Sequence, residues 1–131
     1  MINLSDIINK HGGESFLVCG MGTSIDQYPR DFYEAWEGVT VGVNEITDLF
    51  TPDYLFNVNL LHDKDYNAFW DKGGREIRYE YMSPSDTVDT EKKGKLSMRG
   101  SGILPAYTAA YQLGAADIFL IGVDGKSTNY A

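Results

Sequence analysis

Residues 16–24 read FLVCGMGTS: a short apolar run, then two glycines on either side of Met21, then two hydroxyl residues. Together with Ser15, the run SFLVC lies between glycines, which is typical of a strand buried on both faces. The glycines after it would let the chain turn tightly, or let a ligand come close to the backbone. The stretch therefore predicts the first strand of a parallel sheet, followed either by an ordinary turn or by a phosphate cradle.

Strand and helix patterns alternate after this stretch. Pro29 favours the start of a short helix and Gly38 its end. Apolar runs bounded by turn residues predict strands, and the second and third of them run into asparagines. In chain order we expect a helix at 29–38, strands at 39–43 and 54–58, a helix at 63–70, and a half-exposed edge strand, REIRYEYM, at 75–82.

Two segments are less regular. Ser5 is expected to cap a short helix with Ile7 and Ile8 as its apolar side. Residues 83–100 are mostly polar with few aliphatic side chains. A stretch of that length inside one domain is usually a functional lid or disordered, and both readings stay open.

The last third gives the clearest pattern. Ser101 and Gly102 lead into ILPAYTAAYQLGA, a helix with its proline in the first turn, and Asp117 introduces the apolar run IFLIGVDG. Strands without polar alternation, separated by helices, are typical of parallel sheets covered on both sides. We therefore expect one domain over residues 1–131 with a three-layer, Rossmann-like α/β fold: a mainly parallel sheet of about five strands with helices on both faces.

Composition limits the classes of partner. The net charge of −8 argues against nucleic acid, and the one dense basic run, at 92–99, is typical of a solvated loop. No segment approaches the roughly 18 apolar residues that span a bilayer. Cys19 is the only cysteine and ends an apolar run, which predicts a buried thiol and a cytoplasmic protein. A homo-oligomer is an open expectation.

The residues that follow the predicted strands are small or polar. In an open parallel sheet, ligands bind at the carboxyl ends of the strands, near the point where strand order reverses. Asparagine side chains can read a base or ribose, and glycines admit a phosphate, so a nucleotide pocket is predicted. Its residues from the strand ends are Gly20, Gly22, Thr23, Ser24, Asn44, Asn57, Gly122 and Asp124.

Other site types are weakly supported. GMGTS lacks the third glycine of the dinucleotide fingerprint and the GK[ST] of a P-loop. Asp63-Lys64-Asp65 has the spacing of a metal clamp, but acidic residues at a helix start are usually caps, so a divalent metal is not favoured. His11 and His62 are the only imidazoles, and His62 is the one expected near the strand ends.

Four segments resemble the bacterial sialyltransferases of the Campylobacter type and related glycosyltransferase-like proteins, often from phage or capsule loci. These are LVCGMGTSID, VGVNEI, YLFNVNL and RGSGILPAYTAAYQLGAADIFLIGVDG. The resemblance implies that the glycine loop, Asn44 and Asn57 hold a nucleotide, such as a CMP-linked sugar. By the same resemblance, Ser101 and Gly102 would contact the donor phosphate or sugar, Gly122, Val123 and Asp124 the base or ribose, and Tyr130 the phosphate.

The sequence departs from that family at three places: two bear on whether the base is cytosine, and the third bears on catalysis. Met21 and Thr23 replace the family's asparagine and proline, and the catalytic histidine that follows the tyrosine has no counterpart here. His62 is the candidate substitute base. We therefore expect a glycosyltransferase-like domain that needs no cofactor beyond its nucleotide ligand and whose catalysis is open. The alternatives are a non-catalytic nucleotide binder and a pyrophosphokinase-like enzyme.

Overall fold

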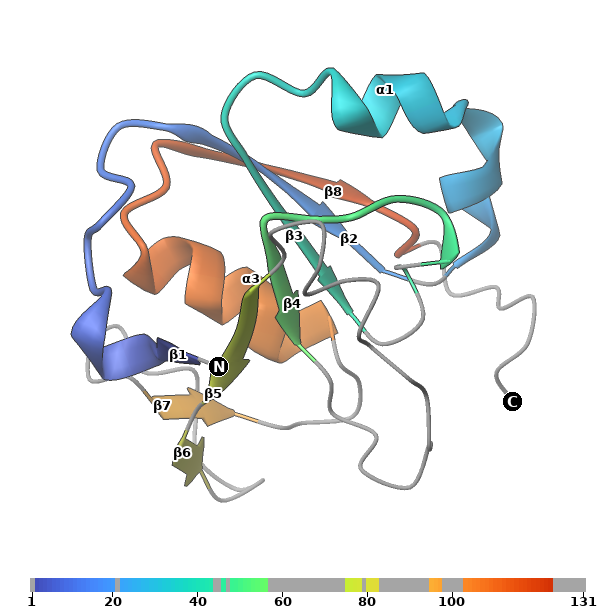
Figure 1. Ribbon diagram of the computed structural model, residues 1–131. Helices are drawn as coiled ribbons and strands as arrows, with labels where there is room; N and C mark the ends of the chain where they lie inside the picture. Colours follow the sequence, from blue (N-terminus) through green and yellow to red (C-terminus); the bar gives the residue numbers. More distant parts are fainter. Residues whose placement is uncertain are drawn as a thin grey trace.

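The apolar run SFLVC forms strand β2 (Ser15–Cys19), which pairs in parallel with two other strands. Its neighbours are β3 (Val39–Val43) and β8 (Asp117–Ile121). The computed structural model describes residues 2–20, 22–43, 46, 48–56, 75–78, 80–82, 95–97 and 103–123. With β4 (Tyr54–Phe56), β5 (Arg75–Arg78) and β1 (Ile2–Asn3), the strands form one parallel sheet in the order β1-β5-β4-β3-β2-β8 (Figure 1). The predicted α/β class with a parallel sheet is confirmed.

The direction of strand addition reverses at β2. From β2 the chain adds β3, β4 and β5 on one side, and helix α3 (Ile103–Gln112) then leads into β8 on the other side. The boundary between β2 and β8 is therefore the topological switch point, where open α/β sheets usually bind ligands.

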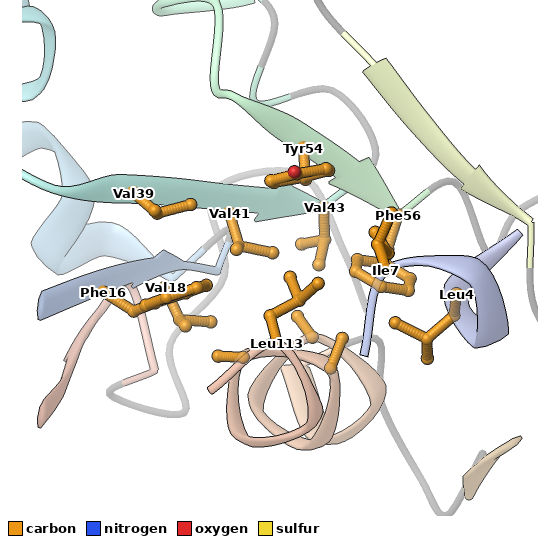
Figure 2. Close-up of a cluster of buried hydrophobic side chains, with 13 residues drawn as sticks. Leu4, Ile7, Phe16, Val18, Val39, Val41, Val43, Tyr54, Phe56 and Leu113 are labelled. Carbon is orange, nitrogen blue, oxygen red and sulfur yellow. The ribbon is translucent and has the colours of Figure 1, made fainter. Parts of the chain in front are cut away.

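A first core cluster lies between the sheet and α3 (Figure 2). Small alanines on α3 let the helix approach the strands closely, and Leu113, just after the helix, packs in the same cluster. Gly114 then ends the helix with φ +100°, a conformation that glycine adopts without strain. The buried members of the cluster are Leu4, Ile7, Phe16, Val18, Val39, Val41, Val43, Tyr54, Phe56, Ala106, Ala109, Ala110 and Leu113.

A second core cluster uses the alternate side chains of β2. Whereas Phe16 and Val18 belong to the first cluster, Leu17 and Cys19 pack with Tyr33 of helix α1 (Arg30–Glu34). Side chains of a strand alternate between its faces, so β2 is buried on both, as predicted. The other buried members are Ile25, Ile46, Phe50 and Leu55.

The N-terminal segment differs from the prediction. Residues Leu4–Asp6 form a 3₁₀ turn, η1, that follows β1, and Asn3 rather than Ser5 stands at its cap. The pattern of Ser5, Ile7 and Ile8 indicated a helical turn but did not show that it starts before Ser5.

The charged segment at 75–82 is two strands and not one. Its first half is β5, which pairs with both β4 and β1 and so is not at the edge of the sheet. Its second half, β6 (Glu80–Met82), pairs in parallel with β7 (Lys95–Ser97) in a separate two-stranded sheet. Residues 83–100, expected to be without regular structure, therefore contain a strand. The helix expected at 63–70 lies outside the described residues.

Strand β8 lies at an edge, contrary to the burial expected from its apolar sequence. Its side chains are exposed or half-buried throughout, with Phe119 52% and Leu120 47% exposed. Among the described strands, only β2 pairs with it, along one side. The run of apolar residues correctly predicted a strand but not its place in the sheet.

Candidate functional site

The loops that follow β2 and β8 meet at the carboxyl ends of the two strands, in what we call the glycine contact. The Gly20 amide donates to the carbonyl of Ile121 (2.8 Å), and the Gly22 amide donates to that of Gly122 (2.7 Å). A Cβ placed on Gly20 would lie 2.5 Å from the Gly122 oxygen, closer than real Cβ contacts allow. Gly122 itself has φ +72°. Both positions need glycine because the two backbones touch.

Ser24 completes this contact from the next turn of the chain. Its Oγ accepts a hydrogen bond from the Gly122 amide (2.9 Å). Thr23, which begins the 3₁₀ turn η2 (Thr23–Gln27), is half-buried beside it. Since the amides of Gly20, Gly22 and Gly122 all donate within the chain, a phosphate at this end of the sheet would need other donors.

Apolar side chains fill the neighbouring part of this end of the sheet. Ile25 of η2 and Ile46, which follows β3, are buried in the second core cluster. Ile46 packs so closely over Gly42 that a Cβ there would lie 2.4 Å from its Cγ2. The Arg30 guanidinium donates to the carbonyl of Leu49 (2.5 Å) and holds this loop against α1.

The structure brings together part of the predicted nucleotide site. Gly20, Gly22, Thr23, Ser24 and Gly122 lie at the switch point, as the strand-end rule anticipates. In sequence, Asn44 and Asn57 directly follow β3 and β4, and Asp124 follows Val123. The predicted residues that lie outside the described part of the chain are Asn44, Asn57, His62, Ser101, Gly102, Asp124 and Tyr130.

A second polar cluster lies at the amino ends of the strands, and sequence reasoning missed it. His11 Nδ1 is 2.6 Å from Glu14 Oε2, and His11 Nε2 is 2.6 Å from the Tyr54 hydroxyl. Tyr54 is fully buried, so no substrate reaches its hydroxyl. The cluster instead links the segment before β2 to the start of β4. Only the short spacing of His11 and Glu14 was visible in sequence, because Tyr54 is 43 residues away from His11.

Asp53 and Thr40 form a similar hydrogen-bonded link between β3 and β4. The Asp53 carboxylate accepts from the Thr40 amide (2.9 Å), and the Asp53 amide donates to Thr40 Oγ1 (2.8 Å). Reciprocal bonds of this kind fix the alignment of neighbouring strands. Like the His11 cluster, this pair has a structural role.

Cys19, the one thiol, is buried, as its place in an apolar run predicts, and burial makes it unreactive. Cys19 is fully buried, and desolvation raises its pKa to about 12. Burial also raises the pKa of Tyr33 to about 12. Because the thiolate is the reactive form, Cys19 cannot act as a nucleophile at neutral pH.

This pKa shift leads to a testable pH dependence. Above about pH 9 an unfolded chain loses the Cys19 proton, whereas the folded chain keeps it up to about pH 12. The unfolded state then binds fewer protons, so the free energy of unfolding should fall as the pH rises through this window. Urea unfolding at pH 7, 9 and 10.5 measures the fall, and Cys19→Ala should make it shallower. Equal slopes in both proteins would contradict the assignment.

The described residues also bear on metal binding and on membrane spanning. No group of three His, Cys, Asp or Glu side chains there is arranged to hold a metal ion. In the same part of the chain, none of the helices has the length and apolar character needed to cross a bilayer.

Comparison with known proteins gives no relative. No family model, curated protein or solved structure matches the chain. Function is therefore inferred from the sequence and from the geometry described above.

Proposed function

We propose that this chain is a glycosyltransferase-like domain that binds a nucleotide or nucleotide sugar at the carboxyl ends of its parallel strands. The observation that carries the proposal is the switch point between β2 and β8, where strand order reverses. Sheets of this class bind ligands at that place because the loops there diverge to opposite sides of the sheet. The two core clusters, with α3 against one set of strand side chains and α1 against the other, support a three-layer Rossmann-like arrangement.

The ligand contacts would come mainly from side chains that follow the strands. The amides of the glycine contact already donate hydrogen bonds within the chain. This contact would therefore support the ligand site from below and would not bind the phosphate itself. Asn44 and Asn57 follow the adjacent strands β3 and β4 and supply amide groups suited to a base or ribose. Ser101 and Gly102 precede α3, whose amino end favours a phosphate. His62 is the candidate general base.

Calorimetric titration with CMP, UMP, AMP and GMP, and with CMP- and UDP-linked sugars, tests the proposal. Asn44→Ala and Ser101→Ala should each weaken nucleotide binding by about 1 to 3 kcal/mol, because a polar group of the ligand loses its partner. Ser5→Ala is the matched control, since Ser5 is exposed on η1 and should leave binding unchanged. Circular dichroism shows whether each variant is folded.

Assays of hydrolysis, sugar transfer and pyrophosphate transfer with the same ligands distinguish the related readings. Nucleotide binding without hydrolysis or transfer of the sugar would indicate a non-catalytic binder. A requirement for Mg²⁺ with pyrophosphate transfer would indicate a pyrophosphokinase-like enzyme. If none of the nucleotides binds, or both variants bind as the parent chain does, the proposed site is wrong.

A further inference from the structure

Strand β8 lacks the features that normally protect the edge of a sheet. Edge strands are usually very short, or carry charges, prolines or bulges that prevent pairing with another chain. At the opposite edge β1 has two residues, but β8 has five, with Asp117 as the only charge. Phe119 and Leu120 in the middle of β8 are about half exposed. Within the described part of the chain, the outer edge of β8 is therefore open to pairing with another strand.

The backbone of β8 shows which groups are available for pairing. The carbonyl of Ile121 points toward β2, because it accepts from the Gly20 amide. Successive residues of a strand direct their peptide groups to opposite sides, so Ile118 and Leu120 direct theirs away from β2. Within the described residues, β2 is the only strand that pairs with β8.

Apolar side chains flank this edge on both faces of the sheet. On one face the centroid of the Phe119 ring lies 5.5 Å from that of Trp36, and ring contacts continue from Trp36 to Phe32 of α1 and from there to Tyr28. Leu120 belongs to the other face, the one that α3 covers, and Tyr107 and Tyr111 of α3 are exposed. Aromatic side chains with few charges are typical of the centre of a protein interface.

We propose that β8 pairs antiparallel with β8 of a second copy of this chain, about a two-fold axis at Phe119. The outward peptide groups fix this alignment. The backbone of Ile118 in each copy exchanges two hydrogen bonds with the backbone of Leu120 in the other copy. Phe119 then faces its own counterpart in a non-hydrogen-bonded pair, with Cα atoms about 4.5 Å apart. The result is one sheet that continues across both copies.

Charge and contact area favour a second copy as the occupant. Asp117 would face Ile121 of the other copy, and the two aspartates would be separated by about four residues, or roughly 13 Å. That distance exceeds the screening length of about 8 Å at physiological salt, so the two aspartates repel each other only weakly. Five half-exposed side chains, Tyr107, Tyr111, Phe119, Leu120 and Val123, would each bury roughly 100 Å². This is about 500 Å² on each copy, and the total of about 1,000 Å² over both copies suits a weak, reversible dimer.

Sedimentation velocity over a range of protein concentrations tests for the dimer. The chain should shift with concentration from 14.6 kDa toward twice that mass. Leu120→Lys should raise the dissociation constant at least tenfold, because it places a charge beside the outward peptide groups. Ser5→Lys adds the same charge at an exposed position on η1 and should leave dimerisation unchanged. A chain that stays monomeric up to several hundred micromolar, or a dimer that Leu120→Lys leaves intact, would overturn the proposal.

Disulfide trapping tests the alignment itself. Under mild oxidation, Phe119→Cys should form a covalent dimer, because Cα atoms about 4.5 Å apart suit a disulfide. Leu120→Cys is the matched control: its own counterpart lies diagonally across the pair, and it should cross-link at least tenfold more slowly. Cys19 is buried and does not compete. Faster cross-linking at residue 120 than at residue 119 would show that the proposed pairing is wrong.

Discussion

Replacing Gly122 with alanine should lower the free energy of unfolding by about 3 kcal/mol, on the order of 10 °C in melting temperature. A Cβ at this position would lie 2.3 Å from the Gly20 oxygen and 2.7 Å from the Gly20 carbonyl carbon. The left-handed φ of +72° costs a residue with a side chain about 1 to 2 kcal/mol more. Separating the two loops would also strain the hydrogen bonds to Gly22 and Ser24, each worth about 1 kcal/mol.

Gly13→Ala is the matched control for this prediction. Gly13 has a similar positive φ of +83°, but a Cβ there would meet no atom within 4 Å. It should therefore show the conformational cost alone, about 1 to 2 kcal/mol. Urea unfolding followed by fluorescence measures both variants. Equal losses in the two would mean that the close approach of Gly20 and Gly122 contributes nothing to stability.

Phe16→Ala should lower the free energy of unfolding by about 3 to 5 kcal/mol, the usual cost of removing a buried aromatic ring. Phe16 is fully buried in the first core cluster, and its ring meets that of His11 edge-on, with the ring centroids 5.9 Å apart. No neighbour can fill the resulting cavity without moving the sheet or α3, because interiors are closely packed.

Phe119→Ala makes the same change on the adjoining strand and is the natural comparison. Because Phe119 is half exposed, its removal should cost about 1 kcal/mol in dilute solution, where a dimer adds nothing. Urea unfolding at low micromolar concentration compares the two variants. A loss at Phe119 as large as that at Phe16 would contradict the exposed position of β8.

Strands buried on both faces could be predicted closely from the sequence. The strands at 15–19 and 39–43 have the predicted limits, because a short continuous apolar run between turn residues is typical of a buried strand. The end of α3 was equally visible, since Gly114 adopts the conformation that a helix-ending glycine usually has.

The surroundings of a strand could not be predicted. The run DIFLI has the same apolar pattern as a central strand, and only the order of the sheet shows that β8 is at the edge. The alternating segment at 75–82 likewise gave no sign that its halves join different sheets. Both errors concern contacts between residues far apart in the chain.

The predicted site shows the same limit. The strand-end rule placed Gly20, Gly22, Ser24 and Gly122 near one another, and they are in contact. The sequence could not show what approaches a glycine so closely, a phosphate or another backbone. In the structure the close neighbour of Gly20 is Gly122.

The position of β2 between β3 and β8 has a consequence for the order of folding. Ser15 aligns with Asp117, 102 residues later in the chain, whereas β3 begins soon after β2. At a synthesis rate of about 5 to 20 residues per second, β2 would wait roughly 5 to 20 seconds on the ribosome for its second neighbour. During that interval a hydrophobic strand remains open on one side, which makes the nascent chain a natural client for chaperones.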